Sequence, residues 1–277
     1  MAMVYSLNFA NGDFKTKQRW NTVTAKFLGG IDKVFEYSPE DIDSSFLNQN
    51  EELLKHSKGF GNYFWKPYLV KKALAEIEEG DYLIYADSGT IFLKNVRRII
   101  NYMNEKNEDV ICFTLPLIER QWTKRDAFVL MECDEPNFSD TVQVTGNFFI
   151  LKKSPKSISF VEEYLKYCSD HRIISDTPNA MGLNNYPEFN AHRHDQSVLS
   201  LLCKKRNILL EGDLSDYGYF PYKYIHNDGY LYDQKSLDDI KTKKFKGTIL
   251  ANRKAHPLIY ALKYYVRLFL YRFGIRT

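Results

Sequence analysis

One short segment, Tyr82 to Ala86, constrains the fold more than any other part of this 277-residue chain. Its five residues are all aliphatic or aromatic, and the polar turn Asp87-Ser88-Gly89 follows at once. A strand without alternating polar residues is typical of the centre of a parallel sheet that is covered on both faces. Other short apolar runs alternate with helix-like stretches along the chain. We therefore predict an α/β protein with a mostly parallel sheet.

Caps and turn residues set the expected bounds of the elements. Strands are predicted at 3–8, 33–37, 81–86, 109–114, 148–152 and 207–210, and helices at 14–28, 65–77, 95–104, 154–168 and 195–204. Ser154-Pro155 is a typical helix start, and Gly29-Gly30 a typical helix end. The stretch 169–193 has little periodicity and is predicted as a long loop, which in a compact domain usually serves as a lid or binding loop.

The composition is that of an ordinary globular protein, with 44% hydrophobic and 26% charged residues. It excludes a disordered or fibrous chain. The four cysteines are far apart and form no Cys-x-x-Cys pair, so neither a zinc site nor a disulfide framework is indicated and a reducing cytosol is expected. The first residues lack the basic start and long apolar run of a signal peptide, and we expect none.

Asp87 is the acidic residue best placed for chemistry. In an open α/β sheet, ligands bind beyond the carboxyl ends of the strands, and Asp87 directly follows the best predicted central strand. The small residues Ser88 and Gly89 would let a diphosphate or a metal approach the backbone closely. The alternative is that Asp87 only caps the following segment.

Four segments, in this order, carry a resemblance. They read Gly59-Phe-Gly-Asn-Tyr-Phe-Trp-Lys66-Pro67, Asp81-Tyr-Leu-Ile-Tyr-Ala-Asp87-Ser-Gly, Val144-Thr-Gly-Asn147-Phe-Phe-Ile and His192-Arg-His-Asp195-Gln-Ser-Val-Leu. Together they resemble bacterial nucleotide-sugar-dependent glycosyltransferases of the GT-A fold. The resemblance spans about residues 3 to 230 and implies a Rossmann-type, mostly parallel sheet flanked by helices.

The resemblance implies a nucleotide-sugar donor, most simply a UDP-sugar, bound at the strand ends. The expected donor-binding residues are Asn8, Asn11, Lys66, Asp87, Ser88, Gly89, Gly146, Asn147 and His194. In such enzymes an Asp-x-Asp motif holds a divalent cation, but here the second carboxylate is absent. A Mn²⁺ or Mg²⁺ ion would therefore need Asp87 and a further ligand, for which the late histidine His226 is the candidate. A structural role for His226 is the alternative.

Asp195 and Gln196 are the expected catalytic residues. They open a predicted helix, whose free N–H groups and dipole suit a phosphate or a departing nucleotide. The segment resembles glycogenin-like retaining transferases, in which an Asp-Gln pair faces the sugar, and this implies a retaining hexosyltransferase. The alternative is that Asp195 caps the helix and the neighbouring histidines are solvated.

A polar, aromatic stretch from Glu119 onward is suited to a glycan acceptor. Trp122, Arg125 and Asp126 are the expected acceptor-binding residues, while Glu119 and Asp126 are both candidates for a general base. One rival function is a sugar-phosphate nucleotidylyltransferase, but the stretch from Ser6 to Arg19 has a single glycine where those enzymes carry a glycine-rich loop. Another rival is a non-catalytic glycan-binding or membrane scaffold protein.

The C-terminal part differs in charge from the rest. Residues 240–277 carry ten Lys and Arg and no acidic residue, so the rest of the chain is acidic although the whole has a net charge of +3. This division argues against a nucleic-acid-binding protein. We predict a catalytic domain over 1–250 and a basic amphipathic tail over 251–277 that lies on an anionic membrane, at the inner face of a bacterial cell membrane where surface polysaccharide is made. A helix packed on the body is the alternative.

Overall fold

The computed structural model describes residues 2–55, 58–225, 229–239, 243–252 and 255–275. A six-stranded sheet runs through it in the order β2-β1-β3-β6-β5-β7, and β6 is antiparallel to both of its neighbours while the other pairs are parallel. The strands are β1 (Val4–Phe9), β2 (Lys33–Tyr37), β3 (Tyr82–Ala86), β5 (Val110–Ile118), β6 (Val142–Lys152) and β7 (Leu209–Gly212). A second, two-stranded sheet pairs β4 (Thr90–Phe92) with β8 (Ile249–Ala251). The α/β prediction is confirmed.

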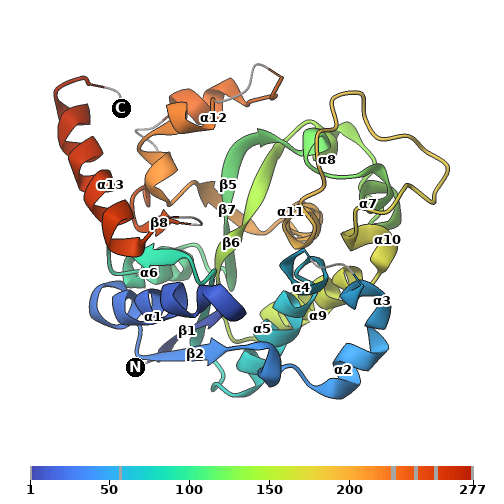
Figure 1. The fold of residues 1–277 in the computed structure, drawn as a ribbon, viewed down its shortest axis with the longest axis horizontal. Coiled ribbons are helices and arrows are strands. Elements are labelled where there is room, and N and C mark those ends of the chain that lie inside the picture. Colours follow the sequence, from blue (N-terminus) through green and yellow to red (C-terminus); the bar gives the residue numbers. More distant parts are fainter. Residues whose placement is uncertain (1, 56–57, 226–228, 240–242, 253–254, 276–277) are drawn as a thin grey trace.

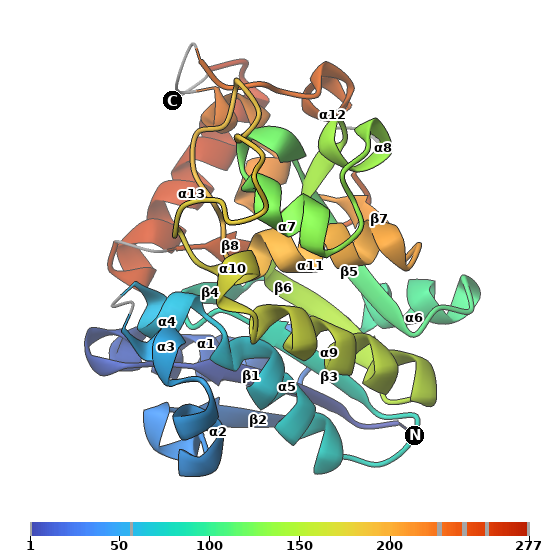
Figure 2. The ribbon, with the colours of Figure 1, turned by 90° about the vertical axis from the view of Figure 1, so that its right-hand side faces the viewer.

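Helices lie on both faces of the sheet (Figures 1 and 2). They are α1 (Lys15–Thr24), α2 (Ser44–Gln49), α3 (Glu51–Leu54), α4 (Gly59–Asn62), α5 (Trp65–Ala75), α6 (Arg97–Glu105), α7 (Arg125–Leu130), α8 (Pro136–Ser139), α9 (Pro155–Cys168), α10 (His171–Ile174), α11 (Asp195–Lys205), α12 (Gln234–Asp238) and α13 (Pro257–Arg272). Ser154 caps α9 by accepting a hydrogen bond from the Ser157 N–H, as the Ser-Pro start predicted.

Strand β3 has apolar side chains on both faces because each face belongs to a different core. Leu83 and Tyr85 pack with α5, α9 and α11, whereas Tyr82 and Ile84 pack with α6 on the opposite face. Successive side chains of a strand point to opposite faces, so every residue of β3 is buried. The central strand therefore reaches its carboxyl end inside the protein, where Asp87 follows.

The sequence prediction was least accurate between 114 and 152. Strand β6 begins at Val142 instead of Phe148, and β5 continues to Ile118. The pairing of β5 with β6 is irregular between Cys112 and Ile118, which obscures the residue pattern that marks a strand. The predicted long loop at 169–193 is irregular apart from the single turn of α10.

The C-terminal helix α13 packs on the body through one face. Tyr264 is buried against Phe220 and Leu250, and the Tyr260 hydroxyl donates a hydrogen bond to Asp216 Oδ2 at 3.0 Å. The opposite face leaves Leu262, Phe269 and other large apolar side chains more than half exposed. Among the described residues, no helix is long and apolar enough to cross a membrane.

Candidate functional site

A pocket of about 440 Å³ lies at the carboxyl ends of β1 and β3. Segments that are distant in sequence form its walls: the turn after β3, the middle of β6, and the starts of α5 and α11. Of the predicted site residues it collects Asn11, Lys66, Asp87, Ser88, Gly89, Gly146, Asn147, His194, Asp195 and Gln196. The resemblance therefore selected segments that the fold brings together.

A buried lysine between two carboxylates is the main charged feature of the pocket. Lys66 forms an ion pair with Asp195, and its Nζ lies 3.7 Å from Asp87 Oδ1. The same ammonium donates a hydrogen bond of 2.8 Å to the carbonyl oxygen of Gly146 and lies 4.7 Å above the ring of Tyr85. The Tyr85 hydroxyl donates to Asp87 Oδ1 at 2.7 Å. One cation thus links three segments of the pocket.

Burial and charge act in opposite directions on this pair. Burial raises the pKa of the Asp195 carboxyl, and the nearby ammonium of Lys66 only partly offsets this effect. For Lys66, burial would lower the pKa, but the charges of Asp195 and Asp87 outweigh burial and leave the pKa raised. Lys66 is therefore a permanent cation at neutral pH, and Asp195 is a carboxylate that binds protons more readily than an exposed one.

Asn8 supports the Asp87 turn from behind and does not line the pocket. Its amide donates to Asn21 Oδ1 at 2.7 Å, and the Asn21 amide in turn donates to the carbonyl oxygens of Asp87 and Thr90 at 3.1 and 3.0 Å. These bonds satisfy the polar backbone of a turn that the surrounding core would otherwise leave unpaired. The Asp87 carboxylate owes its position to this network as well as to β3.

Gly146 is required by a close approach between β6 and α11. A Cβ atom at this position would lie 2.9 Å from Gln196 Cβ and 3.4 Å from Asp195 Oδ2. The Gly146 N–H donates to Gln196 Oε1 at 3.1 Å. The missing side chain therefore lets the two predicted catalytic residues lie directly against the strand.

A left-handed turn forms another wall of the pocket. From Gly59 to Tyr63 all five residues have positive φ angles, between 53° and 80°, although three of them are not glycine. For each of the three non-glycine residues this conformation costs roughly 1–2 kcal/mol relative to the right-handed form. The turn places Phe60 and Tyr63 in the pocket lining. Strain of this kind is found mainly at functional positions.

The predicted acceptor residues lie outside the pocket. The buried carboxylate of Asp126 accepts hydrogen bonds from the N–H groups of Ala180 and Met181, at 2.6 and 3.2 Å, and so holds the long loop. Arg125 pairs with Asp134 at 2.8 Å. Trp122 is buried, the Arg193 guanidinium stacks over its ring at 4.2 Å, and its carbonyl oxygen accepts a hydrogen bond from the Arg193 N–H at 3.1 Å. Their role in acceptor binding stays a prediction.

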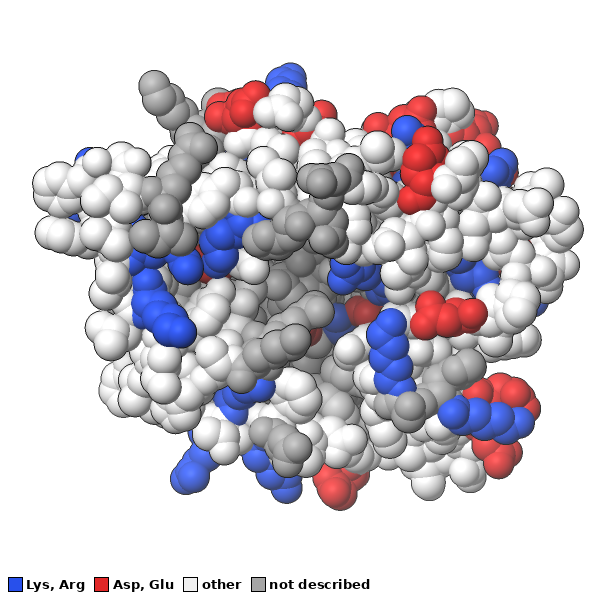
Figure 3. All heavy atoms as spheres, turned by 45° about the horizontal axis from the view of Figure 1, so that its top comes forward, with Lys and Arg blue, Asp and Glu red and all other residues white. Residues whose placement is uncertain are grey.

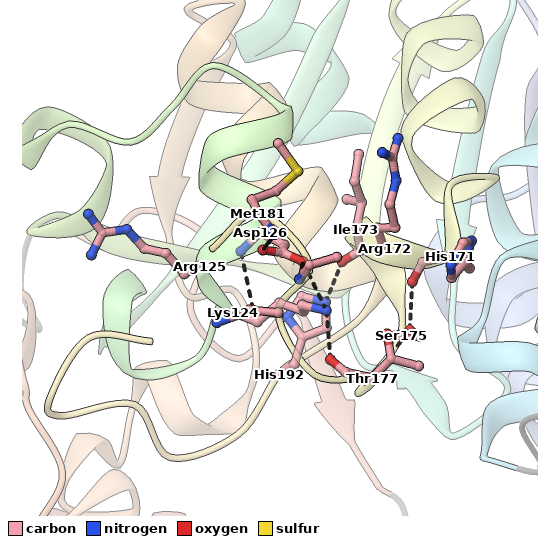
Figure 4. Close-up of polar contacts among 12 residues, drawn as sticks. Lys124, Arg125, Asp126, His171, Arg172, Ile173, Ser175, Thr177, Met181 and His192 are labelled. Atoms are coloured by element: carbon pink, nitrogen blue, oxygen red, sulfur yellow. Dashed lines mark hydrogen bonds and ion pairs between the residues drawn. The ribbon is translucent and has the colours of Figure 1, made fainter. Parts of the chain in front are cut away.

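His192 belongs to the same loop anchor, which Figure 4 shows together with Lys124 and Asp126. Its Nδ1 accepts from the Lys124 N–H at 3.2 Å, so its Nε2 carries the proton and donates to the Ile173 carbonyl oxygen at 2.9 Å. Burial lowers the pKa of His192 well below its usual value. The ring is therefore neutral, and it joins the pocket wall to the helix at the other end of the loop.

Two carboxylates line the described part of the pocket, and because Asp195 is buried in an ion pair with Lys66, the more exposed Asp87 is the candidate ligand for a metal ion. No group of three or more His, Cys, Asp or Glu side chains suited to a metal ion occurs among the described residues. The Asp87 side chain is about a third exposed, and only its Oδ1 is engaged by Tyr85 and Lys66. His226, the second predicted ligand, lies outside the described residues.

Sequence reasoning missed several residues of the site. Ala251 and Asn252 line the pocket because β8 returns beside the Asp87 turn, where the Asn252 N–H donates to the Gly89 carbonyl oxygen at 3.1 Å. Phe60 and Tyr63 also line the pocket, but the sequence analysis gave them no role beyond their place in the motif at 59–67. The paired glycines Gly59 and Gly61 are a local signal for unusual backbone, but nothing near Asn252 in the sequence indicates its pairing.

Comparison with solved protein structures identifies the fold of this chain. No protein-family model and no curated protein matches the chain. The galactosyltransferase LgtC in complex with donor and acceptor sugar analogues has a TM-score of 0.50 at 9% identity, covering 95% of this chain and 95% of that chain. An active-site variant of LgtC gives 0.50 at 10%, covering 91% and 88%. The apo bifunctional glycosyltransferase WbbM gives 0.52 at 7%, covering 92% of this chain and 46% of that chain. The chain has the GT-A fold.

Proposed function

We propose that the protein is a glycosyltransferase that moves a sugar from a nucleotide diphosphate donor, such as a UDP-sugar, to a glycan or lipid-linked glycan acceptor. The observation that carries this proposal is Lys66 with its two carboxylates, at the strand ends of a GT-A fold. The fold is shared with LgtC, whose structure holds donor and acceptor sugar analogues. A pocket of about 440 Å³ is in the range of small-molecule sites.

The residues divide into two roles under this proposal. Asp87, Ser88 and Gly89 hold the diphosphate end, and the ammonium of Lys66 and the start of α11 offset the negative charge that develops as the nucleotide leaves. Asp195 and Gln196 face the donor sugar. Buried Asp195 is a desolvated carboxylate beside the pocket, which suits stabilisation of positive charge on the sugar in a retaining transfer.

A divalent cation, Mn²⁺ or Mg²⁺, is part of the proposal. Asp87 Oδ2 and the donor diphosphate would supply oxygen ligands, with His226 as the further protein ligand. Isothermal titration of the nucleoside diphosphate with metal and with chelator tests this point. We expect tighter binding with metal, and equal affinity in both conditions would remove the cation from the proposal.

Slow hydrolysis of nucleotide sugars tests the activity without knowledge of the acceptor. A set of nucleotide sugars is incubated with the wild type and with Asp195→Asn, with and without Mn²⁺. We expect one donor to release nucleotide, and the variant to lose at least ten-fold in turnover while it still binds the nucleotide. Exposed Lys71→Met on α5 is the control. Hydrolysis of no donor would favour the glycan-binding scaffold, whereas equal hydrolysis by the variant would contradict the catalytic role of Asp195.

We also propose that α13 attaches the protein to an anionic membrane. Its exposed face carries apolar side chains that are half or more exposed: Leu258, Ile259, Leu262, Tyr265, Val266, Phe269 and Phe273. Lys263 and Arg272 lie on the same helix, and Figure 3 shows mostly uncharged and basic surface on the side where α13 lies. Apolar residues would enter the interface while each basic residue near the surface contributes about 1 kcal/mol.

Liposome flotation tests the attachment. The double variant Leu262→Ser/Phe269→Ser removes two of the most exposed apolar side chains without touching Tyr264, so the helix should stay packed on the body. We expect it to float far less with phosphatidylglycerol vesicles than the wild type, and salt to weaken the wild type further. Leu183→Ser, on the long loop, is the control. Equal flotation of the double variant would refute the role of α13. We further propose, in line with the sequence resemblance, that the protein acts at the inner face of a bacterial membrane in surface polysaccharide synthesis.

A further inference from the structure

One face of α11 is polar although the helix is otherwise buried in the core. Gln196, Ser200 and Lys204 recur every four residues, a spacing that places them on the same side of the helix. The residues between them, from Val198 to Cys203, are largely apolar and buried. This polar row meets two buried side chains from other elements, Glu119 after β5 and Gln143 on β6.

Glu119 accepts hydrogen bonds with both of its carboxylate oxygens. Oε1 accepts from the Thr123 hydroxyl at 2.6 Å and from the Gln143 amide at 3.1 Å, while Oε2 accepts from the Ser200 hydroxyl and from Lys204 Nζ at 2.7 Å. The side chain is completely buried. A carboxylate paired with an ammonium can only accept, so each of these partners must present a hydrogen.

The same requirement fixes the orientation of two side-chain amides, Gln143 and Gln196, that connect Glu119 to the pocket. Because Gln143 turns its NH₂ group to Glu119, its Oε1 faces Gln196 and accepts from Gln196 Nε2 at 2.8 Å. Gln196 then turns its own Oε1 to the N–H of Gly146 at 3.1 Å. Reversal of the Gln196 amide would set two oxygens against each other at Gln143 and two N–H groups against each other at Gly146.

The chain leaves one hydrogen of Gln196 for a ligand. An amide NH₂ has two hydrogens, and Gln143 accepts only one of those of Gln196. No described residue accepts the second, and Gln196 lines the pocket beside Asp195. We propose that Glu119 is a positioning residue that, through Gln143, holds the Gln196 amide with this N–H toward an oxygen of the bound donor. The inference rests on the proposed function for the identity of the ligand.

A carboxylate-to-amide exchange tests the direction of the chain. In Glu119→Gln the Lys204 ammonium, which can only donate, keeps the oxygen of the new amide on its own side, so the NH₂ group faces the NH₂ group of Gln143. Either this link then breaks, or Gln143 reverses and forces Gln196 to reverse. We expect kcat for donor hydrolysis to fall about ten-fold, the value of one hydrogen bond in the transition state, with unchanged affinity for the nucleoside diphosphate. Gln143→Met cuts the chain without changing charge and should give the same result.

The exchanged pair Glu119→Gln/Gln143→Glu separates positioning from stability. The carboxylate now at position 143 accepts from the new amide at position 119 on one side and from Gln196 on the other, so Gln196 keeps its native direction. We expect kcat to recover to within about three-fold of wild type, although Lys204 has lost its carboxylate partner. Thr123→Val is the matched control, because it removes a donor to Glu119 without reversing Gln143, and it should lower stability but leave kcat unchanged.

The side-chain amide signal of Gln196 gives a readout that does not depend on activity. In ¹H–¹⁵N spectra, identified by its loss in Gln196→Met, this signal should shift in Glu119→Gln and return toward its wild-type position in the exchanged pair. If no nucleotide sugar is turned over by the wild type, the proposed function fails while the spectra still test the positioning. A folded Glu119→Gln with wild-type kcat and an unshifted signal, or an exchanged pair no better than Glu119→Gln, would overturn the inference.

Discussion

Replacement of Lys66 by methionine should show how much the buried pair with Asp195 contributes to the free energy of unfolding. Lys66 and Asp195 are each 3% exposed, so the change leaves a buried carboxylate without its cation. Removal of one partner from a buried ion pair costs about 3–5 kcal/mol, because the remaining charge stays desolvated. We expect the free energy of unfolding to fall by that amount at pH 7. Lys71→Met on the same helix breaks a half-exposed pair with Glu162 and should cost less than about 1 kcal/mol.

The charge origin of this loss can be separated from lost packing in two ways. In the double variant Lys66→Met/Asp195→Asn no buried charge is left at this pair, so it should be about 2–3 kcal/mol more stable than the sum of the two single changes implies. Acid should also rescue Lys66→Met. Burial raises the pKa of Asp195, and loss of the cation raises it further, so the folded variant binds a proton at a pH where the unfolded chain does not. Its stability must therefore rise as pH falls toward the ordinary carboxyl range near about 4.

Urea unfolding followed by circular dichroism measures the wild type, Lys66→Met, Asp195→Asn, the double variant and Lys71→Met at pH 7 and at pH 4.5. The comparison is made between variants at each pH, since other groups of the protein titrate as well. Additive changes within about 0.5 kcal/mol in the double variant, together with a pH-independent deficit in Lys66→Met, would refute the view that a desolvated charge dominates this site.

Three further changes probe the walls of the pocket. Gly146→Ala places a Cβ 3.2 Å from the Gln196 backbone, and we expect a loss of about 1–3 kcal/mol in urea unfolding and slower donor hydrolysis. The pKa of His192 is lowered by burial, so the unfolded chain gains a proton first and stability falls as pH drops below about 6.5; His192→Gln should flatten this part of the urea midpoint profile. Asp126→Ala leaves the N–H groups of Ala180 and Met181 without their acceptor, and limited proteolysis should then cut the long loop faster.

The sequence predicted correctly the places of those candidate site residues that directly follow a strand or begin a helix. An apolar strand followed by Asp87 places that carboxylate at the strand ends in any fully covered sheet, and the helix start at Asp195 is visible in the sequence. To predict the places of Asp87 and Asp195, it is enough to know the type of the local element and the residue at which it begins or ends. The left-handed turn is a different case, because Phe60 and Tyr63 adopt a conformation that their own side chains disfavour.

Long-range polar contacts were beyond sequence reasoning. Glu119 and Gln143 are 24 residues apart, and Gln143 and Gln196 are 53 apart, so no periodicity connects them. Glu119 was one of two candidates for a general base, but in the structure it is fully buried and bound to four donors. A polar row on α11 was the available signal. Its partner could be found only from the fold.

The charged groups of the pocket are also part of what holds the protein together. Lys66 on α5 is bonded to Gly146 on β6 and to Asp195 on α11, and it lies beside Asp87 at the end of β3. Under the proposed function, a donor diphosphate that attracts this ammonium would compete with Asp195 for it, weaken the pair and leave the carboxylate more reactive toward the sugar. Variants of Lys66 or Asp195 therefore report on chemistry only when their free energies of unfolding are measured beside their activities, whereas the Glu119 and Gln143 exchange changes the direction of one amide and leaves the pair intact.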